Sequence, residues 1–180
     1  MRHPFFVASR PLLFAHRGGS GLAPENTVHA FDAAIGLGVD GLELDVRFSR
    51  DGVVVVHHDL SLARTTNVSV PVDSLTADEL AHVDAAHQFR PAVTLQTAPG
   101  VRATSPVTAP LAGQGIGVPR LADVLSRYRD IRIIIELKLN EPALAAAVID
   151  LVRGAGADDR VCLGSFGRRV LRAARAQAPR

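Results

Sequence analysis

The sequence predicts an α/β fold built around a parallel sheet, and three observations lead to this prediction. First, 47% of the 180 residues are hydrophobic but only 4% are aromatic, so Val, Ile, Leu and Ala must fill the interior, as in buried parallel sheets. Second, short apolar runs recur along the chain, and third, helical patterns lie between most of them. This alternation favours parallel strands joined by helical crossovers, and hence an α/β sheet or barrel.

The apolar runs predict five buried strands, of which the last is the weakest. In chain order they cover residues 12–15, 41–46, 53–57, 131–137 and 160–163. The connection between the second and third runs is too short for a helix, although an extended chain could run back along the sheet at about 3.3 Å per residue. We therefore expect a crossover without its helix at this point.

Helices are predicted between most of the other strands. Asn26 is a candidate N-cap for a helix that ends near Gly36, and Thr76 with Glu79 forms a capping box for a second helix. Further helices are expected over residues 120–128, 142–153 and 167–177.

The segment 87–119 is rich in Pro, Gly, Thr and Gln and has no clear period. A structureless segment of this length is usually either functional or disordered. In a barrel it would form a loop or lid over one mouth, and an insertion without a role is the alternative.

Composition and charge argue against several classes of protein. The net charge is only +2, and its excess lies mostly in arginines near the end of the chain, where a solvated helix face is favoured over a nucleic-acid surface because no aromatic residues interleave. Cys162 is the only cysteine, so no intrachain disulfide can form. Arg10 and Pro11 interrupt the N-terminal apolar run, and no run approaches the roughly 18 apolar residues of a membrane span. We expect a soluble, cytoplasmic protein.

Polar residues gather where the predicted strands end. Side chains alternate along a strand, so Glu43 and Asp45 share one face, and Glu136 and Lys138 share one face of another strand. In parallel α/β folds, binding and catalytic sites are built at this end of the sheet. The residues concerned are His16, Arg17, Glu43, Asp45, His57, His58, Asp59, Glu136 and Lys138.

Three carboxylates of like charge in one small region need a positive partner, because an unpaired charge in an apolar strand is costly. Pairing each with a nearby arginine or lysine is the structural alternative, but it accounts poorly for all three together. Carboxylate oxygens are the ligands of hard cations, while thiol ligands are absent and the histidines are too few to require zinc. Glu43, Asp45 and Glu136 therefore predict a site for one divalent cation, Mg²⁺ or Ca²⁺.

Such a cation beside Arg17 and Lys138 would make a pocket for a phosphate, where positive groups neutralise charge on the non-bridging oxygens. His16 and His58 follow different strands and could flank the phosphorus as general base and general acid, because imidazole titrates near neutral pH. His57 is expected to point the other way from His58 and to be structural.

The motifs follow one another in a characteristic order and spacing along nearly the whole chain. They are Ala15-His16-Arg17-Gly18, Pro24-Glu25-Asn26-Thr27, Glu43-Leu44-Asp45-Val46, Asp51-Gly52, His58-Asp59, Arg64-Thr65-Thr66, Val118-Pro119-Arg120-Leu121 and Glu136-Leu137-Lys138. The set resembles the glycerophosphodiester phosphodiesterase family. The resemblance implies a TIM-barrel-type (β/α) fold of the phosphatidylinositol-phospholipase-like kind, Mg²⁺ or Ca²⁺ as cofactor, and hydrolysis of glycerophosphodiesters to an alcohol and glycerol 3-phosphate.

The resemblance also assigns roles by position. It implies that Asn26 positions the first helix and that Arg64 braces the loop after His58. For the site itself it implies general acid and base roles for His16 and His58, metal ligands at Glu43, Asp45 and Glu136, and phosphate contacts from Arg17 and Lys138.

Five strands are fewer than the eight of a complete barrel, which takes about 250 residues. We therefore expect one domain over residues 1–180, truncated after about five strands, with open sheet edges that favour self-association. Three functions stay open: an active enzyme acting on small glycerophosphodiesters, a catalytically inactive remnant that binds metal or phosphoester, and a sphingomyelinase D-like or lysophospholipase D-like enzyme on the same barrel.

Overall fold

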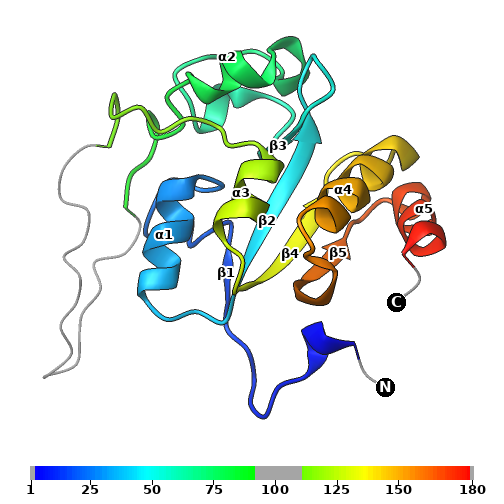
Figure 1. Ribbon diagram of the computed structural model, residues 1–180. Coiled ribbons are helices and arrows are strands. Elements are labelled where there is room, and N and C mark those ends of the chain that lie inside the picture. Colours follow the sequence, from blue (N-terminus) through cyan, green and yellow to red (C-terminus); the bar gives the residue numbers. More distant parts are fainter. Residues whose placement is uncertain (1–2, 92–110, 179–180) are drawn as a thin grey trace, which may run out of the picture.

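Strands and helices alternate along most of the chain in the computed structural model, which describes residues 3–91 and 111–178 (Figure 1). The strands are β1 (Phe14–His16), β2 (Gly41–Phe48), β3 (Val54–Val56), β4 (Arg132–Leu137) and β5 (Val161–Gly164). The α-helices are α1 (Val28–Gly36), α2 (Ala77–Ala81), α3 (Leu121–Arg127), α4 (Pro142–Gly154) and α5 (Arg168–Gln177). The 3₁₀ helices are η1 (Pro4–Phe6), η2 (Leu62–Arg64), η3 (Val72–Ser74) and η4 (Asp158–Arg160).

Four strands form a parallel sheet in the order β1-β2-β4-β5. Its register places His16 of β1 beside Glu43 of β2, and Asp45 of β2 beside Glu136 of β4. Because the carboxyl ends of parallel strands meet at one edge, residues that are far apart in the sequence converge there.

The two faces of the sheet have opposite character. On one face Leu42, Leu44, Ile133 and Ile135 are fully buried in a core that also contains side chains of α1, α3, α4 and α5. The intervening positions of β2 and β4 carry Glu43, Asp45 and Glu136, so the helices cover one face and the carboxylates occupy the other. This arrangement is typical of α/β barrels.

The third strand corrects one expectation from the sequence. β3 pairs antiparallel with β2, so this connection is a hairpin and not a crossover that lacks its helix. The chain reverses over residues 49–53, where the backbone N–H of Ser49 donates to Val53 O at 2.9 Å and Gly52 adopts φ +74°. Asp-Gly sequences favour such turns because glycine accepts a positive φ without strain. The hairpin returns the chain to the site, where the backbone N–H of His57 donates to Asp45 O at 2.9 Å.

The predicted helices are present, with small shifts at their ends. The N-cap of α1 is Thr27 and not Asn26, because Thr27 Oγ1 accepts a hydrogen bond from the backbone N–H of Ala30 at 3.1 Å. The capping box predicted for Thr76 and Glu79 is formed at the start of α2.

A smaller apolar cluster lies beneath α2 and includes Leu62, Leu80 and Val118. The backbone N–H of Val118 donates to Leu80 O at 3.1 Å, which ties the segment before α3 to α2. Of the loop predicted over 87–119, residues 92–110 lie outside the described part of the chain, and its role as a lid stays a prediction.

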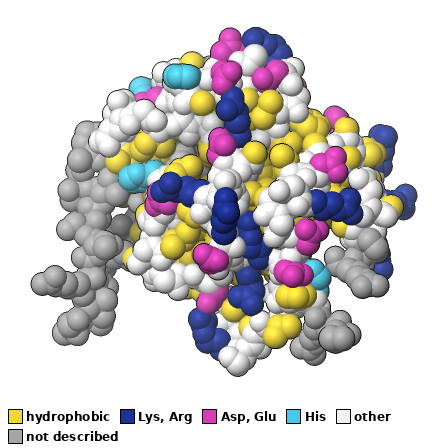
Figure 2. Space-filling view, viewed as in Figure 1, with side chains coloured by type: hydrophobic (Ala, Val, Ile, Leu, Met, Phe, Trp, Pro, Cys, Tyr) yellow, Lys and Arg dark blue, Asp and Glu magenta, His cyan; other side chains and the backbone are white. Residues whose placement is uncertain are grey.

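The visible surface carries charges of both signs, interspersed with small apolar areas (Figure 2). The four arginines of α5 are exposed, on the side of the helix away from the buried Val170 and Ala174. Within residues 3–91 and 111–178, no helix combines the length and the apolar character that crossing a membrane requires.

Candidate active site

Three carboxylates converge on the sheet face that the helices leave free. One carboxylate oxygen from each of Glu43, Asp45 and Glu136 lies within 4.8 Å of the other two. Asp45 is fully buried, and its Oδ1 finds no hydrogen-bond partner among the described residues. The structure thus brings together the three residues that the sequence singled out as metal ligands.

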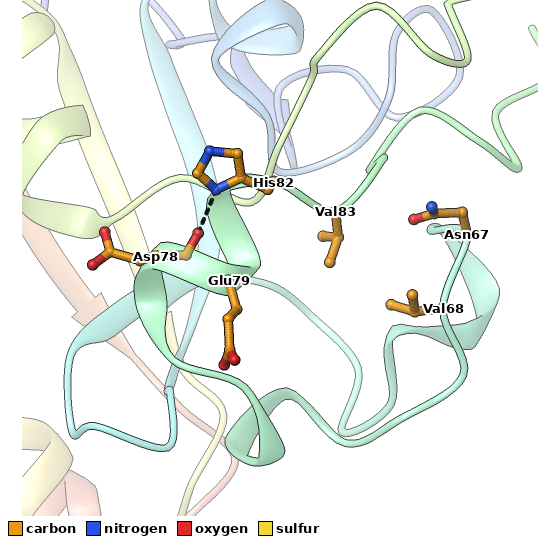
Figure 3. A pocket seen from close by; sticks show the side chains of 6 residues that line it. All are labelled: Asn67, Val68, Asp78, Glu79, His82 and Val83. Carbon is orange, nitrogen blue, oxygen red and sulfur yellow. Dashed lines mark hydrogen bonds between the residues drawn. The ribbon is translucent and has the colours of Figure 1, made fainter.

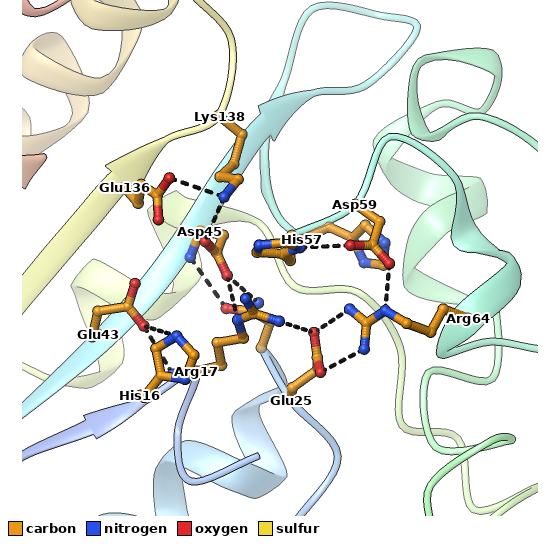
Figure 4. Close-up of polar contacts among 12 residues, drawn as sticks. His16, Arg17, Glu25, Glu43, Asp45, His57, Asp59, Arg64, Glu136 and Lys138 are labelled. Carbon is orange, nitrogen blue, oxygen red and sulfur yellow. Dashed lines mark hydrogen bonds and ion pairs between the residues drawn. The ribbon is translucent and has the colours of Figure 1, made fainter. Parts of the chain in front are cut away.

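Two cationic side chains flank Asp45 (Figure 4). Lys138 Nζ donates to Glu136 Oε1 at 2.9 Å and lies 3.6 Å from Asp45 Oδ1. Arg17 Nε lies 3.3 Å from Asp45 Oδ2, and the backbone N–H of Arg17 donates to Glu43 Oε2 at 2.9 Å. The two cations offset part of the repulsion among the carboxylates.

The donor set fits a hard divalent cation. Burial raises the pKa of Glu43, and the neighbouring negative charges of Asp45 and Glu136 raise it further, against the opposing hydrogen bond from the backbone N–H of Arg17. A cation among the three carboxylates would reverse this repulsion and would give the orphaned Asp45 Oδ1 a partner. Three carboxylate oxygens are the ligand type that Mg²⁺ and Ca²⁺ prefer.

The loop after β1 holds Arg17 in a left-handed backbone conformation, with φ +52°. A non-glycine residue in this region is strained by about 1 kcal/mol or more, and such strain persists where the surroundings over-determine it. Gly18 follows at φ +77°, and a Cβ there would lie 2.7 Å from the Phe31 ring and 2.9 Å from Ala30 Cβ. The close packing of α1 against this loop therefore fixes the direction of the Arg17 amide toward Glu43.

Asn26 has a role at the site that the sequence did not reveal. It is buried, has φ +58°, and donates from its backbone N–H to Arg17 O at 2.9 Å. Its side-chain Nδ2 donates to Asp45 Oδ2 at 2.8 Å. The signal available was the Pro24-Glu25-Asn26-Thr27 motif, whose position before a helix favoured a capping role instead.

The two candidate acid-base histidines have different surroundings. The side chain of His16 is 66% exposed, and its Nε2 lies 3.9 Å from Glu43 Oε2. His58 Nδ1 is hydrogen-bonded to Asp59 Oδ1 at 2.5 Å, and the backbone oxygen of His58 accepts a bond from Arg47 Nε at 2.9 Å. The imidazole ring and the backbone of His58 are therefore both held by hydrogen bonds, whereas the side chain of His16 is largely exposed.

His57 differs from His58 in both exposure and contacts. It is buried, its Nε2 lies 3.4 Å from Ser61 O, and burial lowers the pKa of its imidazole. The structural role expected for His57 agrees with these surroundings.

A network of ion pairs joins the loop after β1 to the loop after β3 (Figure 4). Arg64 donates to both carboxylate oxygens of Glu25, at 2.8 and 2.7 Å, and from Nε to Asp59 Oδ2 at 2.5 Å. Glu25 Oε1 also accepts a bond from Arg17 at 3.1 Å. Burial opposes ionisation, but the bonds from Arg64 and His58 lower the pKa of Asp59 to about 2, and those from Arg64 and Arg17 lower the pKa of Glu25. Both carboxylates are therefore ionised at neutral pH.

Among the described residues, one pocket borders the site at His16 and another lies apart from the site. One of about 400 Å³ adjoins His16 and is bounded by β1, the glycine-rich loop after it and α1. The other, of about 450 Å³, is formed around α2, and none of the predicted site residues lines it (Figure 3). Its lining residues are Asn67, Val68, Asp78, Glu79, His82 and Val83.

A parallel sheet with helices on one face and an acidic, cation-flanked site at its carboxyl edge is typical of proteins built on an α/β barrel. The model of the glycerophosphoryl diester phosphodiesterase family matches residues 16–176, and the chain belongs to this family.

Known relatives agree with this assignment. A glycerophosphodiester phosphodiesterase of Bacillus altitudinis is 35% identical over 157 residues, which cover 86% of this chain and 57% of that protein. The chain spans between 44% and 64% of the length of the first four curated relatives that it matches.

Solved structures show the same fold. The glycerophosphodiester phosphodiesterase from Agrobacterium tumefaciens str. C58 aligns with a TM-score of 0.75 at 34% identity, covering 94% of this chain and 64% of that one. A phosphodiesterase from Oleispira antarctica, in complex with the product sn-glycerol-3-phosphate, aligns with a TM-score of 0.73 at 28% identity, covering 94% and 63%. The predicted TIM-barrel-type α/β fold is confirmed.

Proposed function

We propose that the chain carries the active site of a divalent-metal-dependent phosphodiesterase that hydrolyses glycerophosphodiesters to an alcohol and glycerol 3-phosphate. The observation that carries the proposal is the convergence of Glu43, Asp45 and Glu136 within 4.8 Å, with Arg17 and Lys138 beside them. Family membership supports the class of reaction. The product bound to the Oleispira antarctica phosphodiesterase supports the identity of the product.

Glu43, Asp45 and Glu136 would hold one divalent cation, Mg²⁺ or Ca²⁺. When bound, the cation supplies Lewis-acid stabilisation of the charge that builds on a phosphoryl oxygen. Arg17 and Lys138 bind the non-bridging oxygens of the same phosphate and orient it. The Lys138 ammonium group is shared between Glu136 and Asp45, and its flexible stem lets it turn toward a bound phosphate.

The two histidines transfer protons on either side of the phosphorus. His58 donates from Nδ1 to Asp59, which leaves Nε2 as the atom that exchanges a proton with the substrate. The exposed His16 takes the opposite role, so that one histidine is the general acid and the other is the general base. The net reaction breaks one P–O bond and adds the elements of water across it.

A substrate panel followed by ³¹P NMR tests the proposal. The purified chain is incubated with Mg²⁺ or Ca²⁺ and with glycerophosphocholine, lysophosphatidylcholine or sphingomyelin in turn. Cation-dependent release of glycerol 3-phosphate from glycerophosphocholine supports the proposal. Turnover confined to the two lipids assigns a lysophospholipase D-like or sphingomyelinase D-like activity instead, and a folded chain that binds cation or phosphoester without turnover contradicts catalysis.

Glu43→Gln is the informative variant for this panel, because it keeps the size of the side chain and removes one ligand charge. Cation binding and turnover should fall together. Glu141→Gln is the matched control, since Glu141 is exposed and its side chain makes no capping bond at the start of α4.

A small-molecule substrate, a cytoplasmic location and self-association through the sheet edges complete the proposal. Cell fractionation tests the location, and size-exclusion chromatography coupled to light scattering tests the assembly.

A further inference from the structure

Arg64 is the one described side chain that contacts both carboxylates behind the candidate site, Glu25 before α1 and Asp59 after β3 (Figure 4). We propose that Arg64 is a positioning residue that holds His58 and Arg17 in place together, acting through Asp59 and Glu25. The proposal rests on the proposed function for the roles of His58 and Arg17.

The first branch runs to His58. Arg64 Nε donates to Asp59 Oδ2, and the other oxygen of the same carboxylate is bonded to His58 Nδ1, each at 2.5 Å. The Asp59 carboxylate is therefore fixed at both oxygens. A fixed acceptor at Nδ1 sets the tautomer and the ring orientation of His58, and with them the direction of Nε2.

The second branch runs to Arg17. Glu25 Oε1 accepts bonds from Arg64 at 2.7 Å and from Arg17 at 3.1 Å, while Oε2 accepts a second bond from Arg64 at 2.8 Å. The Glu25 side chain is only 13% exposed, so these bonds are made in a largely desolvated setting. Glu25 thus links the guanidinium group of Arg64 to that of Arg17 and keeps Arg17 beside Asp45.

The guanidinium shape is what this double contact requires. Arg64 uses three N–H donors on two carboxylates, which its rigid planar fork can reach at once. A lysine in its place would keep the charge but present its donors from a single point. The Arg64 side chain is 48% exposed, so solvent partly screens its charge. The positions of its three N–H donors therefore matter more than its charge for holding Glu25 and Asp59.

Arg64→Ala and Arg64→Lys test the proposal in the full chain, with two readouts that need no turnover. The first is the imidazole NMR signals of His58, and the second is the affinity for glycerol 3-phosphate measured by calorimetry. We expect altered His58 signals and affinity about 10-fold weaker in both variants, with turnover reduced by about 10- to 100-fold. Methylguanidinium should partly restore Arg64→Ala, and urea should not.

Matched variants separate the two branches. Asp59→Asn should change the His58 signals and lower kcat, whereas Glu25→Gln should weaken glycerol 3-phosphate binding and raise KM. Arg127→Ala is the control, because Arg127 makes a comparable two-bond contact with Asp32 between α3 and α1, apart from the site. It should leave all readouts unchanged.

Unaltered His58 signals and unaltered affinity in a folded Arg64→Ala or Arg64→Lys protein would overturn the proposal. Altered signals and affinity in a chain whose unsubstituted form shows no turnover would instead overturn the proposed function and leave the positioning role standing.

Discussion

Asn26 and Asp45 are joined by two hydrogen bonds of opposite direction. The side-chain Nδ2 of Asn26 donates to Asp45 Oδ2 at 2.8 Å, and the backbone N–H of Asp45 donates to Asn26 Oδ1 at 3.2 Å. Both residues are buried. Only a side chain that is both donor and acceptor can make this pair of bonds, so the Asn26 carboxamide fixes the Asp45 carboxylate through Oδ2. Oδ1 of Asp45 accepts no hydrogen bond from the described residues and lies 3.6 Å from Lys138 Nζ.

Asn26→Ala should therefore weaken both the fold and the cation site. The substitution leaves a buried N–H and a buried carboxylate oxygen without these partners, and it places alanine at a positive φ. We expect the free energy of unfolding to fall by about 3 kcal/mol, measured by urea denaturation without added cation. Calorimetry should show weaker binding of Mg²⁺ or Ca²⁺. A variant as stable as the parent chain would contradict this account of Asn26.

Gly18→Ala should disturb the loop that carries Arg17. The new Cβ would meet the Phe31 ring and Ala30 at distances that real Cβ atoms do not tolerate, in a backbone conformation that disfavours alanine. A loss of about 2 kcal/mol in unfolding free energy is expected. Gly19→Ala has a similar φ but nothing within 4 Å of the new Cβ, so it is the control and should cost less.

His57 should make the stability depend on pH. Burial lowers the pKa of its imidazole, so the unfolded chain takes up a proton before the folded chain does. The contribution of neutral His57 is fully present above about pH 6.5 and is lost as the pH falls below that value toward the folded-state pKa. His57→Gln should reduce the loss of unfolding free energy between about pH 7 and pH 5. Equal losses in the two proteins would argue against a buried neutral imidazole.

Lys138 can be tested by chemical labelling, because it is the only lysine in the sequence. An amine-reactive acylating reagent can then modify only Lys138 and the N-terminal amine, and peptide mass mapping distinguishes the two. If Lys138 binds phosphate, glycerol 3-phosphate should slow its labelling and leave labelling of the N-terminus unchanged. Equal rates with and without glycerol 3-phosphate would remove Lys138 from the phosphate site.

The sequence predicted those parts of the fold that depend on local patterns. The apolar residues of β2 and β4 located these two strands, and alternation along β2 placed Glu43 and Asp45 on the face opposite the buried Leu42 and Leu44. The direction of β3 was missed because a run such as Val53-Val54-Val55-Val56 has no alternation that distinguishes a crossover from a hairpin. Asp51-Gly52 was the available turn signal.

The contacts that bind the site together depend on backbone conformations and long-range pairing, which the sequence did not reveal. An asparagine just before a helix predicts an N-cap, and nothing in the sequence shows that Asn26 instead adopts φ +58° and binds Asp45. The pairing of Arg64 with Glu25 joins residues 39 positions apart, and no spacing rule links them. The motifs that contain Glu25, Asn26 and Arg64 indicated that these residues matter, but they did not show which residues each one contacts.

The most direct test of the central claim is the cation dependence of hydrolysis. Glycerol 3-phosphate released from glycerophosphocholine by the purified chain is measured before chelation, after chelation with EDTA, and after Mg²⁺ or Ca²⁺ is returned. A site built on Glu43, Asp45 and Glu136 predicts turnover that chelation abolishes and the returned cation restores, with Glu43→Gln inactive throughout. Turnover that persists in EDTA, or a Glu43→Gln protein as active as the parent chain, would contradict it.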